Sequence, residues 1–292
     1  MTNITHPDKV LFPEDGYTKA DMVDYYKAVA SVMLPHMRHH PLAMLRFNDG
    51  IHGERFFHKQ APDYFPDFIE RVDVPKSKGK TRYAVCNNVE ALTYIANHNT
   101  IEFHVLPVRA DDLWHPDRVV FDLDPSVDDF SSVRAAARWL HDLLNELGLM
   151  SFVMTSGSRG LHIWVPLDRK STVEEVMAFA SGVASMLVAK HPDELTTQFS
   201  KADRGDRIYV DVNRNAPAQH AVTPYSLRAK PHAPVAMPIE WAEVDDANLT
   251  PTRYTLADAP GVVADRGDAW KGIRRSVRSL RKAAAIVSAP SN

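Results

Sequence analysis

The C-terminal half of the chain alternates between short apolar runs typical of strands and longer apolar stripes typical of helices. The run Arg118-Val-Val-Phe-Asp-Leu-Asp124 predicts a buried strand, which Pro125 ends. Apolar residues then recur at three- and four-residue steps, which predicts a helix over 131–147. Gly148 is a natural residue to close that helix, because glycine adopts the left-handed conformation without a steric penalty.

The elements that follow in this half occur in an order that defines a fold. A capping-box pattern at Ser171 and Glu174 predicts a helix that runs to about residue 190. Shorter runs rich in strand-forming residues predict strands over 151–154, 161–165, 207–212 and 223–229. The order strand, helix, strand, strand, helix, strand is that of a split βαβ sheet. We therefore expect an α+β fold with an RRM-like sheet and helices on one of its faces.

The two ends of the chain carry weaker signals. A capping box at Thr18 and Asp21 predicts a helix that Pro35 ends, and 75–80 is expected to be an exposed basic loop. Near the C-terminus, apolar residues between Trp270 and Ala284 follow one helical stripe, which predicts a helix over 270–287. Residues 265–292 hold seven Lys/Arg and two acids, so this helix either packs with a solvated face or contacts phosphate.

Composition narrows the class of protein. The 292 residues carry a formal net charge of −3, which excludes a bulk-cationic nucleic-acid coat but allows a local basic site. The single cysteine, Cys86, excludes an intramolecular disulfide and a thiolate zinc site in a monomer. The start of the chain does not resemble a signal peptide, and no run is long enough to span a bilayer. We therefore expect a soluble protein of a reducing compartment, without a membrane partner.

Carboxylates at the ends of two predicted strands are the strongest chemical signal. Asp122 and Asp124 are two positions apart on a strand, so they project from the same face. Asp211 stands among strand formers in a second apolar run. Three such carboxylates suit two Mg²⁺ or Mn²⁺ ions about 3.5–4 Å apart. The alternatives are an acidic turn after the first strand and simple pairing of Asp211 with a nearby arginine.

A turn between two predicted strands offers phosphate-binding groups. It contains Ser156, Gly157 and Arg159, and His162 begins the next strand. Backbone N–H groups in such a turn can point at an anion, and an arginine can bind a phosphate through two hydrogen bonds. Taken alone, the segment is an ordinary connection between strands. Beside three candidate metal ligands, a metal–triphosphate site becomes the better interpretation.

Two other stretches of the chain carry residues suited to binding a nucleotide or nucleic acid. Residues 196–230 hold six Lys/Arg against three acids, and Arg204 and Arg228 are candidates for neutralising polyphosphate. In Arg55-Phe-Phe-His-Lys59, aromatic and cationic residues are interleaved, as on a surface that stacks bases and follows phosphates. The alternative is that Phe56 and Phe57 belong to the core.

These motifs together resemble the archaeo-eukaryotic primase superfamily, and most closely the polymerase domain of bacterial DNA ligase D. The resemblance covers nearly the whole chain in order, and the series is far more specific than any single motif. It rests on His6-Pro-Asp-Lys-Val-Leu-Phe-Pro13, Thr18-Lys-Ala-Asp21, Phe56-Phe-His-Lys-Gln60, Glu102-Phe-His-Val105, Phe121-Asp-Leu-Asp-Pro125, Thr155-Ser-Gly-Ser-Arg-Gly-Leu-His162, Tyr209-Val-Asp211 and Pro224-Tyr-Ser-Leu-Arg228.

The resemblance implies a two-subdomain primase-polymerase fold and a template-directed nucleotidyltransferase. The subdomains would be an N-terminal part over 1–115, an RRM-like catalytic part over 116–262, and a basic C-terminal helix and tail over 263–292. The enzyme would add NTPs, with ribonucleotides preferred over dNTPs, to a primer 3′-OH at short gaps or double-strand breaks. Its cofactors would be two Mn²⁺ or Mg²⁺ ions.

The resemblance also implies roles for particular residues. The carboxylates that would bind metal and carry catalysis are Asp122, Asp124 and Asp211. The residues that would bind the nucleotide are Ser156, Gly157, Arg159, His162, His104, Arg204, Arg228 and Phe57, the last by stacking. Lys9 and Lys19 would recognise the downstream 5′-phosphate of gapped or broken DNA.

Some positions depart from the family pattern. Arg159 stands where lysine is common, Arg214 where glutamine is frequent, and Leu45 where lysine is frequent. No ligase or nuclease module occurs within the 292 residues, so we expect a stand-alone, monomeric relative in the bacterial cytoplasm or nucleoid. It would work with a separate DNA ligase and a Ku-like protein, and excision-repair gap filling is an alternative to end joining.

Three other functions compete with this interpretation. A DNA-end binding module with little catalysis would gain nothing from concentrated negative charge close to phosphate. A primase would start strands without a primer. A metal-dependent phosphodiesterase would use carboxylates but would not need a basic set large enough for a triphosphate.

Overall fold

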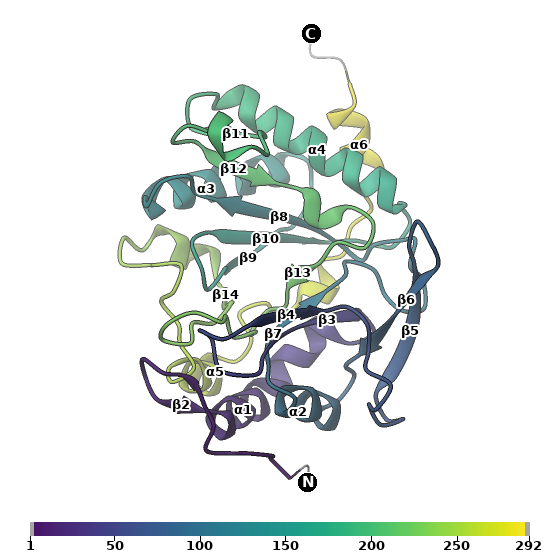
Figure 1. Ribbon diagram of the computed structural model, residues 1–292. Coiled ribbons are helices and arrows are strands. Elements are labelled where there is room, and N and C mark those ends of the chain that lie inside the picture. Colours follow the sequence, from purple (N-terminus) through teal and green to yellow (C-terminus); the bar gives the residue numbers. More distant parts are fainter. Residues whose placement is uncertain (1–2, 290–292) are drawn as a thin grey trace.

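Two six-stranded sheets face one another in the computed structural model, which describes residues 3–289. Figure 1 shows helices on the outer side of each sheet, so that the layers run helix, sheet, sheet, helix. The expected α+β class is therefore confirmed. No helix within residues 3–289 is long and apolar enough to cross a membrane.

One of the two sheets, here called the C-terminal sheet, has the strand order β11-β12-β8-β10-β9-β14. Along the chain, β8, α3, β9, β10, α4 and β12 follow the predicted split βαβ order, with α3 and α4 on the outer face (Figure 1). The bounds of its elements are β8 Arg118–Asp124, α3 Phe130–Glu146, β9 Phe152–Thr155, β10 Leu161–Pro166, α4 Val173–Lys190, β11 Leu195–Thr196, β12 Ile208–Asp211 and β14 Pro238–Ile239.

The other sheet, here called the N-terminal sheet, has the strand order β13-β7-β3-β6-β5, with β4 paired to β3. Helices α1 and α2 cover its outer face (Figure 1). Its elements are α1 Lys19–Met37, β3 Pro41–Phe47, β4 Arg55–His58, β5 Glu70–Pro75, β6 Lys80–Val85, α2 Val89–Asn97, β7 Thr100–Val105 and β13 Ala221–Val222. Strand β13 follows β12 in the chain but pairs with β7, so the chain returns to the N-terminal sheet.

The remaining elements are short. They are the β1 Val10–Phe12 and β2 Tyr17–Thr18 hairpin, α5 Ala259–Arg266, α6 Arg281–Val287, and the 3-10 helices η1 Lys201–Asp203, η2 Asn213–Asn215, η3 Trp241–Asp245 and η4 Ile273–Arg275. One continuous hydrophobic core joins residues of both sheets. The relative placement of the two sheets is therefore part of the folded core rather than a loose contact.

Local signals explain where the long helices begin. Asp129 caps α3 by accepting hydrogen bonds from the backbone of Ser131 and Ser132. The apolar stripe predicted from the sequence is buried against the sheet, and Gly148 closes the helix at φ +74°. At α1, Thr18 and Asp21 form the predicted capping box.

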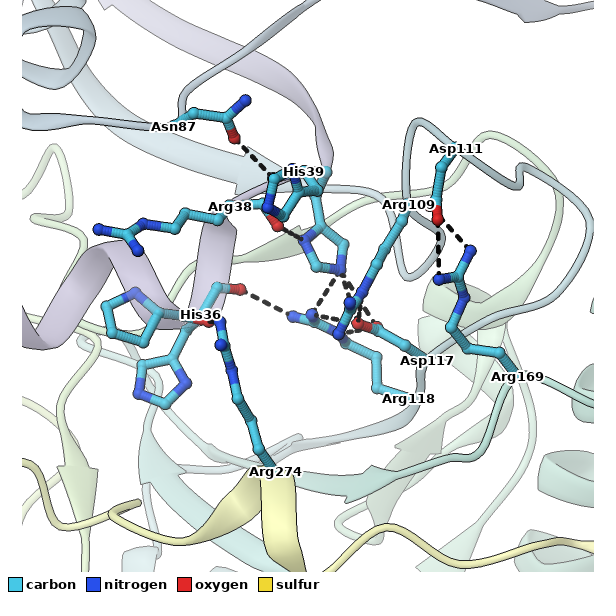
Figure 2. A network of polar contacts seen from close by, with 12 residues as sticks. His36, Arg38, His39, Asn87, Arg109, Asp111, Asp117, Arg118, Arg169 and Arg274 are labelled. Carbon is cyan, nitrogen blue, oxygen red and sulfur yellow. Dashed lines mark hydrogen bonds and ion pairs between the residues drawn. The ribbon is translucent and has the colours of Figure 1, made fainter.

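A buried ionic network ties the two sheets together at the beginning of β8. The Asp117 carboxylate accepts hydrogen bonds from Arg109 Nε at 2.7 Å and Arg118 Nε at 2.6 Å, and it contacts His40 Nε2 at 3.1 Å. Figure 2 shows Arg118 reaching the backbone of His36 at the end of α1, a contact of 3.0 Å. Although burial opposes ionisation, the charges of Arg118 and His40 hold the pKa of Asp117 well below its usual range. The network therefore links α1 and β3 to β8.

The predicted start of α4 is wrong by one residue, and Pro35 does not end α1. The cap of α4 is Thr172 with Glu175, not Ser171 with Glu174. Helix α1 continues through Pro35 to Met37. A proline this close to the end removes only one hydrogen bond, and Ser31, whose carbonyl loses it, is exposed to water.

Two other predicted elements are wrong. Only Ala221–Val222 forms a strand in the region where 223–229 was expected. Tyr225 has φ +66°, and Ser226 N donates to Thr223 O, so the chain turns there. The predicted helix over 270–287 is divided into η4 and α6, because Gly272 at φ +106° and a non-helical stretch interrupt it. Its apolar residues Trp270 and Leu280 are nevertheless buried.

Gly160 allows β8 to pass close to the 155–160 turn, which yields a prediction. A Cβ built on Gly160 would lie 1.8 Å from the Leu123 carbonyl oxygen, between the two aspartates of β8. We expect Gly160→Ala to lower the free energy of unfolding by about 1–3 kcal/mol, because overpacking forces backbone shifts. Urea unfolding of the variant and of the wild type measures the difference.

The matched control is Gly261→Ala in α5, where no atom lies within 4 Å of the added Cβ. This substitution should leave stability unchanged or raise it, because alanine is the better helix former. Equal stability of the two variants would contradict the close approach of β8.

Candidate active site

Pairing of β8 with β12 brings three carboxylates to one place. Asp122 lies directly opposite Asp211 in the antiparallel register, and Asp124 lies opposite Tyr209. Asp122 and Asp124 share a face because they are two positions apart on a strand. One ligand oxygen from each of Asp122, Asp124 and Asp211 lies within 4.8 Å of the others. This triad has the donor type and spacing to hold a divalent metal ion.

Two basic side chains contact the triad. His162 on β10 contacts Asp122 at 3.2 Å, and Arg214 contacts Asp122 at 3.3 Å and Asp211 at 3.5 Å. Burial alone would raise the pKa of Asp122, but the charges of His162 and Arg214 outweigh it and lower that pKa to about 2. Burial and the neighbouring Asp122 charge raise the pKa of Asp124 to about 6. The carboxylates therefore remain under mutual repulsion that a further cation would relieve.

The turn after β9 is tightly ordered by its own side chain and by two glycines. Ser156 Oγ accepts hydrogen bonds from the backbone of Ser158 at 3.2 Å and Gly160 at 3.0 Å. Gly157 has φ +61°, and a Cβ there would lie 2.7 Å from Arg228 Cγ. Arg228 in turn donates to the Ser156 carbonyl at 2.5 Å. The turn and Arg228 are therefore held as one unit.

Glu102 on β7 holds two basic side chains of the site, and the sequence analysis quoted it in a motif without giving it a role. Its carboxylate contacts His104 Nε2 at 2.9 Å and Arg228 Nε at 3.1 Å, and it accepts from Ala229 N at 2.9 Å. Burial opposes ionisation, but Arg228 and His104 lower the pKa of Glu102 to about 2. Its spacing of two from His104 on a strand is the signal that would have found it.

A cavity between the two sheets joins these groups. Two carboxylates of the triad, Asp122 and Asp124, line it together with basic and hydroxyl side chains. Its lining residues are His104, Asp122, Asp124, Ser156, Ser158, His162, Arg214, His220, Val222 and Arg228. Ser158 lies in the 155–162 motif but was given no role, and no motif in the sequence marks His220. Phe57 on β4 is 45% exposed, and its ring centroid lies 5.6 Å from those of His104 and His220.

Two predicted phosphate-binding arginines do not line this cavity. Arg159 is exposed and its guanidinium donates to the Pro125 carbonyl. Arg204 is buried, donates to the carbonyls of Gln198 at 3.0 Å and Phe199 at 2.7 Å, and lies 3.9 Å above the Tyr209 ring. The donors of Arg204 are therefore largely used within its own loop.

Lys9 and Lys19 form a separate basic cluster beside α1. The backbone N of Lys19 donates to Lys9 O at 2.8 Å, and Lys19 Nζ donates to Thr5 Oγ1 at 2.8 Å. Lys9 contacts Asp49 at 3.3 Å. Burial, with the charges of Lys9 and Arg46, lowers the pKa of Lys19 to about 8. A buried lysine close to two other cations is a favourable place for an anion.

Known proteins are similar to this chain in sequence, and one solved structure is similar to it in fold. The family model described as "LigD, primase-polymerase domain" matches residues 18–270. The multifunctional non-homologous end joining protein LigD of Mycolicibacterium smegmatis is 35% identical over 254 residues, which are 86% of this chain and 33% of that protein. The bifunctional LigD of Bacillus subtilis is 32% identical over 254 residues, 86% of this chain and 41% of that protein.

A solved structure gives the same result in three dimensions. The polymerase domain of Mycobacterium tuberculosis Ligase D in complex with DNA matches with a TM-score of 0.89 at 32% identity, covering 95% of this chain and 99% of that one. The chain spans between a third and two fifths of the length of these curated LigD relatives. The resemblance inferred from the ordered motifs is confirmed: this chain belongs to the LigD primase-polymerase domain family.

Proposed function

We propose that this chain is a template-directed nucleotidyltransferase that extends a DNA primer at short gaps or double-strand breaks. The observation that carries the proposal is one cavity lined by Asp122 and Asp124 of the carboxylate triad together with the phosphate-binding groups His104, Ser156 and Arg228. A triphosphate is the ligand that needs both, because its charge must be balanced and its α-phosphorus must lie near the metal ligands.

The triad fits divalent ions, since three carboxylates within 4.8 Å, two of them buried, repel one another unless a cation lies between them. Asp122, Asp124 and Asp211 would hold two manganese or magnesium ions, which when bound activate the primer 3′-hydroxyl and neutralise the triphosphate. In the proposed reaction the 3′-oxygen attacks the α-phosphorus and pyrophosphate leaves. The role of the carboxylates is to fix where that attack occurs.

The basic side chains of the cavity would bind the triphosphate. Arg228 and His104 would face its oxygens while Glu102 fixes both side chains. The backbone N–H groups of Ser158 and Gly160 already donate to Ser156 Oγ, so they fix the shape of the turn beside the triphosphate. His162 would position Asp122 through their 3.2 Å contact. Arg159 and Arg204 would reach the nucleotide only by leaving their present carbonyl partners.

The remaining predicted residues would recognise the base and the DNA. Phe57 is half exposed beside the cavity, so its ring can stack on the incoming base or the template. Lys9 and Lys19 would bind the 5′-phosphate on the far side of a gap. The similar mycobacterial domain was solved in complex with DNA, which supports DNA as the partner.

The relatives are named as non-homologous end joining proteins, which supports a role of this chain in that process. Its preferred substrates would be ribonucleotides. A separate ligase and a Ku-like protein would complete the pathway. The DNA-end binding module is the less favoured function, because the Asp triad would repel phosphate unless it held metal.

The proposed chemistry predicts that Asp122→Ala abolishes primer extension in manganese, because it removes a carboxylate shared by the triad. The loss should exceed about a thousandfold in rate, as expected when two-metal catalysis is lost. Binding to 5′-phosphorylated gapped DNA should change less than twofold. Asp128→Ala, at an exposed aspartate just beyond β8, is the control and should extend normally. Extension retained by the Asp122 variant would overturn the assignment.

The position of Arg214 leads to a prediction about metal affinity. Its guanidinium contacts two of the three carboxylates, so it should compete with a metal ion for them. We expect Arg214→Gln to tighten Mn²⁺ binding several-fold, since an internal cation no longer competes. Without metal, the variant should unfold at a lower temperature than the wild type. Mn²⁺ titration and melting in chelator measure these two effects.

Arg207→Gln is the matched control, since Arg207 donates to backbone carbonyls of Asp203 and Arg204 rather than to the triad. Unchanged or weaker metal binding by the Arg214 variant would show that the arginine does not act as the counter-ion.

The lowered pKa of Lys19 predicts a pH dependence of DNA-end recognition. Below about pH 8 Lys19 is protonated and attracts phosphate; above it the side chain becomes neutral and that attraction is lost. The affinity ratio of 5′-phosphorylated to 5′-hydroxyl gapped DNA should therefore fall between pH 7 and pH 9. Lys19→Arg should keep the ratio constant over this range. A ratio independent of pH in the wild type would exclude Lys19 as the phosphate ligand.

A further inference from the structure

His220 is a buried polar residue of the cavity with no role in the mechanism above. It immediately precedes β13, the short edge strand of the N-terminal sheet (Figure 1). The residue is 6% exposed and lines the same cavity as His104, Ser156 and Arg228. Its Nε2 atom is buried and has no hydrogen-bond partner among the described residues. A buried imidazole nitrogen without a partner is costly, unless a ligand supplies the missing bond.

Aromatic contacts fix the position of the ring. The His220 ring stacks on Tyr83, with centroids 5.7 Å apart and planes at 28°, and it meets Phe57 edge-on with centroids 5.6 Å apart. His220 therefore touches the ring proposed to stack on the base while it lines the cavity proposed to bind the triphosphate. In a nucleotide the sugar connects these two parts. The residue that adjoins both subsites lies where the sugar would pass.

The charge state of His220 favours a neutral group over a phosphate. Burial, assisted by the charges of Lys59, His104 and Arg214, lowers the pKa of His220 to about 3. The neutral ring offers one donor or one acceptor at Nε2, and a sugar hydroxyl can take either role.

His162, the other cavity histidine with an unpartnered nitrogen, differs because its Nε2 already contacts Asp122 at 3.2 Å. It therefore acts on the carboxylate triad. No hydrogen bond or ion pair joins His220 to the three aspartates among the described residues, so the bond that its buried Nε2 lacks would have to come from a bound substrate.

We propose that His220 hydrogen-bonds to the sugar hydroxyls of the incoming nucleotide and thereby favours a nucleotide carrying a 2′-hydroxyl. This inference rests on the proposed function and names a specificity-determining residue within it. A site built to bond a hydroxyl discriminates against the analogue that lacks it, because its buried polar atom is then left unpaired.

The test compares single-nucleotide incorporation of an NTP and the matching dNTP on one gapped primer in manganese. His220→Phe keeps an aromatic ring against Tyr83 and Phe57 but removes the nitrogen, whereas His220→Gln restores a hydrogen-bonding group. We expect the ratio of kcat/KM for NTP over dNTP to fall about tenfold in the phenylalanine variant, a magnitude typical of one lost hydrogen bond. Most of this fall should come from a lower kcat/KM for the NTP. The glutamine variant should recover part of the lost ratio.

Nucleotide affinity of the enzyme–DNA complex, measured by fluorescence with ribo- and deoxynucleotides, should show the same selective loss. An unchanged ratio, or an equal loss for both sugars in both variants, would overturn the role of His220 while wild-type extension upholds the proposed function. If the wild type incorporates neither nucleotide, the proposed function fails and this inference fails with it.

Discussion

Like charges held close together in a buried place are the constraint on which the rest of this site depends. Asp122, Asp124 and Asp211 approach within 4.8 Å, at a position where two of them are almost fully buried. Such a cluster is unfavourable unless cations surround it. The chain supplies His162 and Arg214 as partial compensation, and the raised pKa of Asp124 shows that the compensation is incomplete. A bound divalent ion would complete the balance.

The carboxylate cluster forms only when β8 and β12 pair in the observed register. A slip of β8 by one residue against β12 would turn Asp122 and Asp124 to the face opposite that of Asp211. Asn215, which is fully buried, accepts from Val120 N at 2.8 Å and donates to Val120 O at 2.7 Å, so it fixes β8 beside the segment that follows β12. At the other end of β8, the Asp117 network joins that strand to α1 and β3. The two sheets are thus held on either side of the cavity.

Local order in the sequence was enough to predict β8, β9, β10 and β12 of the C-terminal sheet, but not its short strands β11 and β14. An apolar run such as that over β8 and a helical stripe such as that of α3 depend only on near neighbours. The carboxylates of β8 could be predicted for the same reason, since alternation alone places Asp122 beside Asp124. Long-range contacts could not be read in this way. The partnership of Glu102 with Arg228 spans 126 positions of sequence, and the place of His220 depends on β13 returning to the N-terminal sheet. The helix predicted over 270–287 is interrupted for a local reason. Gly272 has a left-handed conformation, which the apolar stripe does not reveal.

Counting bound manganese ions tests the central claim most directly. Electron paramagnetic resonance of free Mn²⁺ can follow a titration of the protein in the presence of a non-hydrolysable nucleoside triphosphate and gapped DNA. If the carboxylate triad and the phosphate-binding wall form one two-metal site, two ions should bind per chain, and Asp122→Ala should reduce that number. Wild-type protein that binds no manganese, or binds it equally well after this substitution, would contradict the account.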